Sequence, residues 1–208
     1  TGLGEKLTAG TSFAAPWITR KAAFLIEKLG LTREIAKALL IDSAIGWDMV
    51  NDEKSEYYGF GVVQKRIENI LTSPKEEIKF YIEGLANSYE TYAHNIPVPL
   101  NSDKYPYIAR ATLCYFPKCS RNQGVDYTNT ELDLYFGRIR DDGSINSIDS
   151  NNQSEGTPSY LKEEGAREYH RKWDNVKHIN YEIKEKLGEL KSYSNKLWAL
   201  SIKAKDRL

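Results

Sequence analysis

The spacing of apolar residues changes near residue 76 from the period of a helix to the period of a strand. Before that point, apolar side chains recur every three or four residues, as on one face of an α-helix. After it they alternate with polar side chains, as on a half-buried β-strand. The run Thr72-Ser73-Pro74 is a boundary signal between the two patterns. We therefore predict two domains, a helical one at 1–74 and a β one at 75–208.

Two helices and a shorter third one are expected in the first part. Apolar residues line one side of 12–29, and Gly30 supplies a left-handed stop. Thr32 is expected to cap a second helix, which Gly46 is expected to end. Residues 64–71 are expected to form the last, short helix. The inner-face residues are Ala14, Ala15, Ile18, Ala22, Leu25, Ile26 and Leu29 in the first helix and Ile35, Ala36, Leu39 and Leu40 in the second.

The second part alternates apolar and polar residues in several segments, which predicts an all-β antiparallel sandwich. A polar stretch at 141–158 is expected to be a long exposed loop, and part of 159–173 a polar helix. The alternating segments are residues 78–82, 107–116, 131–136, 179–183 and 198–202.

Charge and composition exclude two classes of partner. Lys plus Arg number 29 and Asp plus Glu number 29, so no basic excess exists to neutralise a nucleic-acid backbone. Apolar stretches stay below the roughly 18 residues that a membrane helix needs, so no membrane partner is expected. The two cysteines fit a cytosolic or a secreted protein, with the cytosol favoured and the compartment left open.

No cofactor is expected, and calcium is left open without a motif that indicates it. Asp141-Asp142-Gly143 is interpreted as a turn, because it lacks the ligand spacing of a calcium-binding EF-hand loop. Cys114 and Cys119 are too few for a structural zinc site. They are either two free thiols or a pair that a bend at Pro117 brings together.

The segment that points to a chemical activity is residues 10–16. Its sequence is Gly10-Thr11-Ser12-Phe13-Ala14-Ala15-Pro16. A serine at a helix start lies beside unpaired backbone N–H groups, which can donate to an oxyanion forming next to its hydroxyl. Gly10 allows a sharp turn and the close approach of a substrate backbone. Pro16 is expected in the first helical turn, where its missing N–H costs no hydrogen bond. Small residues at Ala14 and Ala15 allow tight packing.

This motif resembles the active-site serine region of the subtilisin-like serine proteases, the subtilases, whose signature is G-T-S-x-A-x-P. Its five specified positions are Gly10, Thr11, Ser12, Ala14 and Pro16, and a chance match has odds of roughly 10⁻⁴. The resemblance covers about residues 1–73, which implies the C-terminal helices of a subtilisin-like α/β catalytic domain. It also implies that Ser12 is the nucleophile attacking a polypeptide substrate. The Ser12 backbone N–H would form half of the oxyanion hole, with Thr11 close enough to assist.

A subtilase also needs an Asp, a His and an oxyanion Asn upstream of its serine. The eleven residues before Ser12 contain none of these. We therefore expect a C-terminal portion of a larger protease, inactive alone, whose partner is the N-terminal remainder of the catalytic domain. His94, His170 and His178 all lie in the second part, and none is expected to act as the base.

Other interpretations compete with this one. Ser12 alone would usually be a helix N-cap. The nucleophile elbow of α/β-hydrolases needs Gly two residues after the serine, where this chain has Ala14. The β part is similar in architecture to the jelly-roll-like accessory domains that follow some subtilase cores. The alternative function is a non-catalytic interaction module attached to a degenerate subtilase domain.

Overall fold

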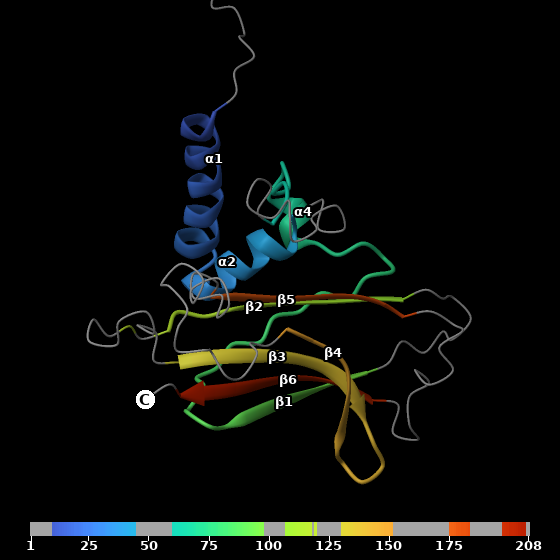
Figure 1. The fold of residues 1–208 in the computed structure, drawn as a ribbon. Helices are drawn as coiled ribbons and strands as arrows, with labels where there is room; N and C mark the ends of the chain where they lie inside the picture. The colour runs from blue at the N-terminus through green and yellow to red at the C-terminus, as the bar shows by residue number, and fades with distance from the viewer. Residues whose placement is uncertain are drawn as a thin grey trace, which may run out of the picture. The chain divides into compact units, whose positions relative to one another are not determined.

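The computed structural model describes residues 10–44, 60–97, 107–117, 119, 130–151, 175–183 and 197–206. The chain divides into two compact units, Thr1–Ile82 and Glu83–Leu208, which we call unit 1 and unit 2. Figure 1 shows the helices of unit 1 in blue to green and the strands of unit 2 in green to red. Residues 72–90 contain neither helix nor strand, and the border that the sequence predicts, 74/75, lies in that stretch.

The described helices of unit 1 begin and end through local backbone chemistry. Gly30 stops the first helical segment with a φ of 69°, as expected for a left-handed C-terminal residue. Thr32 caps the next helix, and its hydroxyl oxygen accepts a hydrogen bond from the Ile35 N–H at 3.4 Å. These elements are α1 (Thr11–Ala23), a π-helical turn η1 (Phe24–Lys28), α2 (Arg33–Asp42) and α4 (Glu68–Leu71).

Two helix ends differ from the sequence-based prediction. Helix α2 ends at Asp42 rather than at Gly46, which lies outside the described residues. Ser43 occupies the end, and its hydroxyl donates to the Leu40 carbonyl at 3.0 Å, so a side chain satisfies an orphan carbonyl. Helix α4 is a single turn, shorter than the predicted 64–71.

A small apolar core and one buried cation hold unit 1 together. Leu25, Ala36, Leu40 and Ile70 form the buried centre of this core. Beside it, the Lys21 ammonium donates to the Lys65 carbonyl at 2.7 Å and lies 3.8 Å from the centre of the Trp17 ring. The lysine thereby joins α1 to the segment that leads into α4.

Six strands are described in unit 2, and every pairing among them is antiparallel. They are β1 (Thr91–Pro97), β2 (Tyr107–Cys114), β3 (Thr130–Ile139), β4 (Ile145–Asn151), β5 (Val176–Ile183) and β6 (Leu197–Asp206). One sheet has the order β1-β6-β3-β4, and the other is the pair β2-β5. Figure 1 shows the β2-β5 pair running alongside the larger sheet.

The core of unit 2 lies between the two sheets. Leu134 and Phe136 of β3, Ile179 of β5 and Trp198 of β6 form its buried centre. The Phe136 and Trp198 rings meet edge to face, with centroids 5.5 Å apart and an interplanar angle of 79°. The predicted antiparallel β-rich unit is therefore confirmed.

Four of the predicted strands are confirmed as β2, β3, β5 and β6. The strand predicted at 78–82 is wrong, because these residues form no strand and pair with none of the described strands. The loop predicted for 141–158 is wrong in part, because residues 145–151 form β4. Asp142 and Gly143 do form the predicted turn, in which the Asp142 carboxylate accepts from the Ser144 N–H at 2.9 Å. The helix predicted within 159–173 lies outside the described residues.

Strand β3 is buried on both faces. Leu134 and Phe136 point into the core, whereas Glu131 and Asp133, on the other face of the alternating strand, are 4% and 0% exposed. A bulge between Phe136 and Gly137 shifts the register with β4. A Cβ at Gly137 would lie 2.6 Å from the Asn146 carbonyl oxygen, so only glycine fits there.

Candidate functional site

Ser12 is exposed in the first turn of α1, where the sequence motif predicts a nucleophile. Gly10 precedes the helix, and its carbonyl accepts from the N–H groups of Phe13 at 3.0 Å and Ala14 at 3.2 Å. Thr11 and Ser12 are the first two helical residues, and N–H groups at those positions have no partner within a helix. The hydroxyl of Ser12 therefore lies beside the positive end of the helix dipole.

Pro16 lies deeper in the helix than the sequence predicts. It is inside α1, which begins at Thr11, so it belongs to the second turn and not to the first. Since proline has no N–H, the Ser12 carbonyl oxygen lacks its usual helical hydrogen bond from residue 16. The prediction that Pro16 removes no hydrogen bond is therefore wrong.

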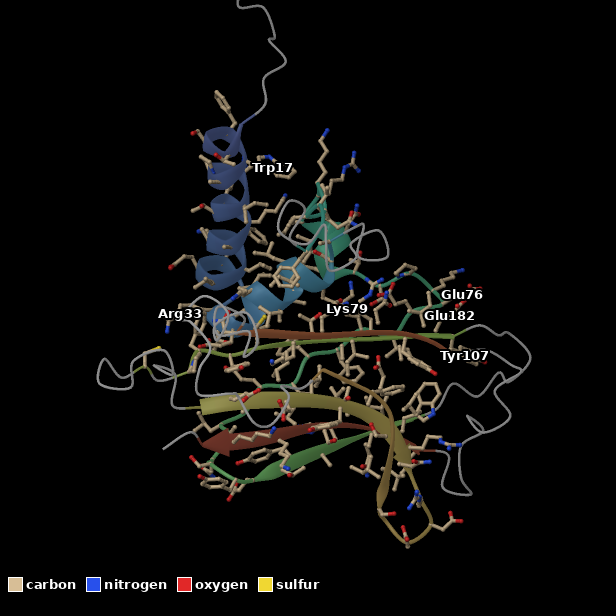
Figure 2. All side chains as sticks on the ribbon, viewed as in Figure 1. Trp17, Arg33, Glu76, Lys79, Tyr107 and Glu182 are labelled. Atoms are coloured by element: carbon tan, nitrogen blue, oxygen red, sulfur yellow. The ribbon has the colours of Figure 1, made fainter. Side chains whose placement is uncertain are left out.

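Three large apolar side chains of the first helical segment stay partly exposed: Phe13 and Trp17 of α1 and Phe24 of η1. Phe13, Trp17 and Phe24 lie within a narrow sector of the helix at 3.6 residues per turn. Their exposed fractions are 62%, 42% and 39%. Figure 2 shows Trp17 projecting from α1. Leu25, the residue directly after Phe24, is by contrast fully buried in the core of unit 1.

No histidine occurs in unit 1, so Ser12 has no imidazole base within its own unit. His94 lies on β1 opposite Leu200 of β6. His170 lies outside the described residues. Neither residue was expected from the sequence to be the base.

The third histidine, His178, pairs with Thr112 across β2 and β5. The Thr112 hydroxyl oxygen and His178 Nδ1 are 2.8 Å apart. Burial, with a smaller contribution from the Arg110 charge, lowers the pKa of His178 to about 3. The imidazole is therefore neutral at physiological pH, where it serves as a cross-strand hydrogen-bond partner.

Both cysteines are free, so the first of the two alternatives stated for them holds. Cys119 is exposed, and its thiol donates to the Pro117 carbonyl at 3.7 Å. Among the residues that the structure describes, no three His, Cys, Asp or Glu side chains gather as metal ligands. Within the same ranges, every helix is too short or too polar to cross a lipid bilayer.

Sequence reasoning missed the buried side chains of Lys21 and Asp133 and the partly buried Thr112–His178 pair. Lys21 had a signal, because it lies three residues after Ile18 and four before Leu25 in an apolar helical stripe. The other groups depend on strand register and on burial of a second sheet face, which alternation does not encode.

In comparisons with known proteins, no protein-family model, curated protein or solved structure matches this chain. The exposed Ser12 at the start of α1, with its flanking motif, is the site on which a function can be built.

Proposed function

We propose that this chain is the C-terminal portion of a subtilisin-like serine endopeptidase with Ser12 as its nucleophile. The observation that carries the proposal is the placement of the motif. Its serine lies exposed in the first turn of a helix, directly after Gly10 and Thr11. That position combines an accessible hydroxyl with backbone donors and a favourable helix dipole.

The reaction is acyl transfer to the serine and then to water. Ser12 Oγ attacks the scissile carbonyl carbon of a polypeptide, while the Ser12 N–H donates to the developing oxyanion and Thr11 assists. The amine leaves with the proton that the base took from Ser12, and water then hydrolyses the acyl-enzyme. The base, its orienting acid and the second oxyanion donor come from the upstream His, Asp and Asn of the same protease.

Exposed apolar side chains near the motif support a larger catalytic domain. Phe13, Trp17 and Phe24 stay partly exposed in unit 1, and a patch of exposed apolar side chains is a surface that another part of a protein can cover. The N-terminal remainder of an α/β catalytic domain would cover this patch and bring the base to Ser12. Without it, the serine hydroxyl stays protonated, and the chain alone is inactive.

Unit 2 is proposed to be a jelly-roll-like accessory domain. Its described strands pair as nested antiparallel ribbons, β1 with β6, β2 with β5, and β3 with β4. Rolling up such a nested ribbon produces the order β1-β6-β3-β4 facing β2-β5, as in a jelly roll with fewer strands. A module of this kind stabilises the catalytic part that precedes it.

A fluorophosphonate probe, which labels only activated serines, tests the proposal. Labelling is expected in the intact protease and not in the 208-residue chain. The Ser12→Ala variant of the intact protease abolishes labelling, whereas Thr19→Ala, on an exposed position of the same helix, leaves it unchanged. A correctly folded intact protein that takes no label would overturn the proposal and favour a non-catalytic interaction module.

A further inference from the structure

Residues 78–86 belong to no helix, strand or turn, and their backbone has no hydrogen-bond partner in the described part of the chain. At its start, an ion pair joins Lys79 Nζ to Glu77 Oε1 at 3.8 Å. Residues i and i+2 share a side in an extended chain and not in a helix. This ion pair fits an extended backbone at the start of the segment.

The side chains of this segment are those of a strand with one apolar face. Ile78, Phe80 and Ile82 lie on one side and are 82%, 53% and 43% exposed. Tyr81 lies between them on the other side and is 57% exposed. Unpaired backbone groups beside an exposed apolar row are a template for pairing with another strand.

The segment is complementary to itself. We propose that two copies of this chain associate by antiparallel pairing of residues 78–84, centred on Tyr81. In that register Phe80 of each copy lies opposite Ile82 of the other, and Tyr81 lies opposite Tyr81. Lys79 lies opposite Glu83 at two symmetric places, so each copy supplies both partners of an ion pair.

The two neighbouring registers that keep the same strand faces together give less favourable pairs of side chains. Centring the pairing on Phe80 places Glu77 opposite Glu83, which sets like charges against each other. Centring it on Ile82 places Phe80 opposite Gly84, which offers no side chain to pack against. The charges and the apolar residues thus select one register, and that register has a twofold axis at Tyr81.

A twofold interface uses the same patch on both copies and closes at a dimer. Because a two-stranded ribbon is only marginally stable in water, the dimer is weak and depends on protein concentration. This association does not rest on the proposed protease activity, so the failure of either leaves the other standing.

A charge exchange across the interface tests the register. Lys79→Glu and Glu83→Lys each place like charges opposite one another twice, and each raises the dimer dissociation constant by about tenfold. The double variant Lys79→Glu/Glu83→Lys restores both pairs and returns the constant to the wild-type value. Sedimentation velocity over a wide concentration series measures all four proteins. A chain that stays monomeric throughout, or a double variant no better than the singles, overturns the proposal.

Covalent trapping provides the second test. In a background carrying Cys114→Ser and Cys119→Ser, Tyr81→Cys places two thiols opposite each other on the twofold axis. Mild oxidation then yields a disulfide-linked dimer. Leu85→Cys is the matched control, because Leu85 is 92% exposed but lies off the axis, opposite Glu77. Equal trapping of the two variants means random collision and contradicts the pairing.

Discussion

The Lys205 ammonium lies 2.8 Å from the carboxylate of Asp133, a residue with no exposed surface. The pair joins the neighbouring strands β6 and β3 diagonally, since Asp133 lies directly opposite Lys203. Burial lowers the pKa of Lys205. The hydrogen bond and charge of Asp133, with the charge of Glu131, outweigh that burial and hold the pKa above its usual 10.5. Lys205 therefore stays charged at neutral pH and compensates a buried carboxylate.

Replacing Asp133 by Asn is expected to lower the free energy of unfolding by about 2 kcal/mol, because it leaves the Lys205 charge without its partner in a partly buried site. The volume of the side chain hardly changes, so packing does not account for the loss. Urea denaturation measures the effect. Asp141→Asn, on an exposed residue of the β3–β4 turn, should change stability by less than about 0.5 kcal/mol. Equal losses for the two variants would contradict this role of Asp133.

Acid is expected to destabilise unit 2 through His178. The folded-state pKa of about 3 lies below the unfolded value of 6.5, so the unfolded chain binds a proton that the folded one does not. Stability attributable to this residue is complete above pH 6.5 and falls as the pH drops toward 3. The total loss is on the order of 2–4 kcal/mol.

The His178→Gln variant isolates that contribution, because glutamine does not titrate. Unfolding free energies of the two proteins are compared at about pH 7 and about pH 4, on either side of the unfolded-state pKa. The wild-type protein should lose more stability than the variant over this interval. Two outcomes would contradict this prediction: parallel pH profiles of unfolding free energy for the two proteins, or a His178 imidazole NMR signal that shifts near pH 6.5.

Gly137→Ala is expected to destabilise the β3–β4 hairpin by about 2 kcal/mol, as overpacking of a tight site does. Its new Cβ would meet the Asn146 carbonyl oxygen at 2.6 Å and the Ile145 side chain at 2.8 Å. Thermal unfolding followed by circular dichroism measures the change. Gly84→Ala is the matched control, because nothing lies within 4 Å of its Cβ position and its φ is not positive. A Gly137→Ala protein as stable as that control would show that β4 moves aside freely.

Lys21→Gln is expected to lower the stability of unit 1 by about 1–3 kcal/mol, since the charge-assisted bond to the Lys65 carbonyl and the contact with the Trp17 ring are both weakened. Lys28→Gln, on an exposed residue of η1, should have no measurable effect. Hydrogen exchange measures the change directly. Amides of residues 61–70 should lose protection in the Lys21 variant alone, and unchanged protection would exclude Lys21 as their anchor.

The sequence predicted those parts of the fold that depend on short-range signals, such as apolar periodicity or a capping residue. The Gly30 stop and the Thr32 cap are local signals, and both were right. The inner face predicted for 12–29 was right in part: Ile18, Ala22, Leu25 and Ile26 lie in or against the core, whereas Ala14, Ala15 and Leu29 are exposed. Strands with apolar alternation, such as β3 and β5, were also found from the sequence.

The wrong predictions concern segments whose conformation or burial depends on pairing with other strands. Residues 78–82 alternate as a strand does, yet a strand needs a hydrogen-bonded neighbour, which sequence periodicity does not specify. Strand β4 was missed because its Asn, Ser and Asp residues are common in loops, whereas its pairing with β3 fixes its conformation. Asp133 was expected on a polar outer face, and burial of that face is set by tertiary structure alone.

For the candidate site, too, the sequence predicted one part correctly and another part wrongly. Ser12, Thr11 and Gly10 were placed correctly at a helix start because the motif itself specifies that turn. The depth of Pro16 was wrong by one turn, because the helix begins at Thr11 and not further along the chain.

Strand β6 lies between β1 and β3, although it is the last of the three to be synthesised. A ribosome therefore releases β1 long before its sheet can close, and the unit cannot complete its core until residue 206 has emerged. During that interval the nascent chain exposes strand edges to chaperones and to proteases. A stop codon or frameshift before Leu197 would remove the middle of the sheet and not merely its border.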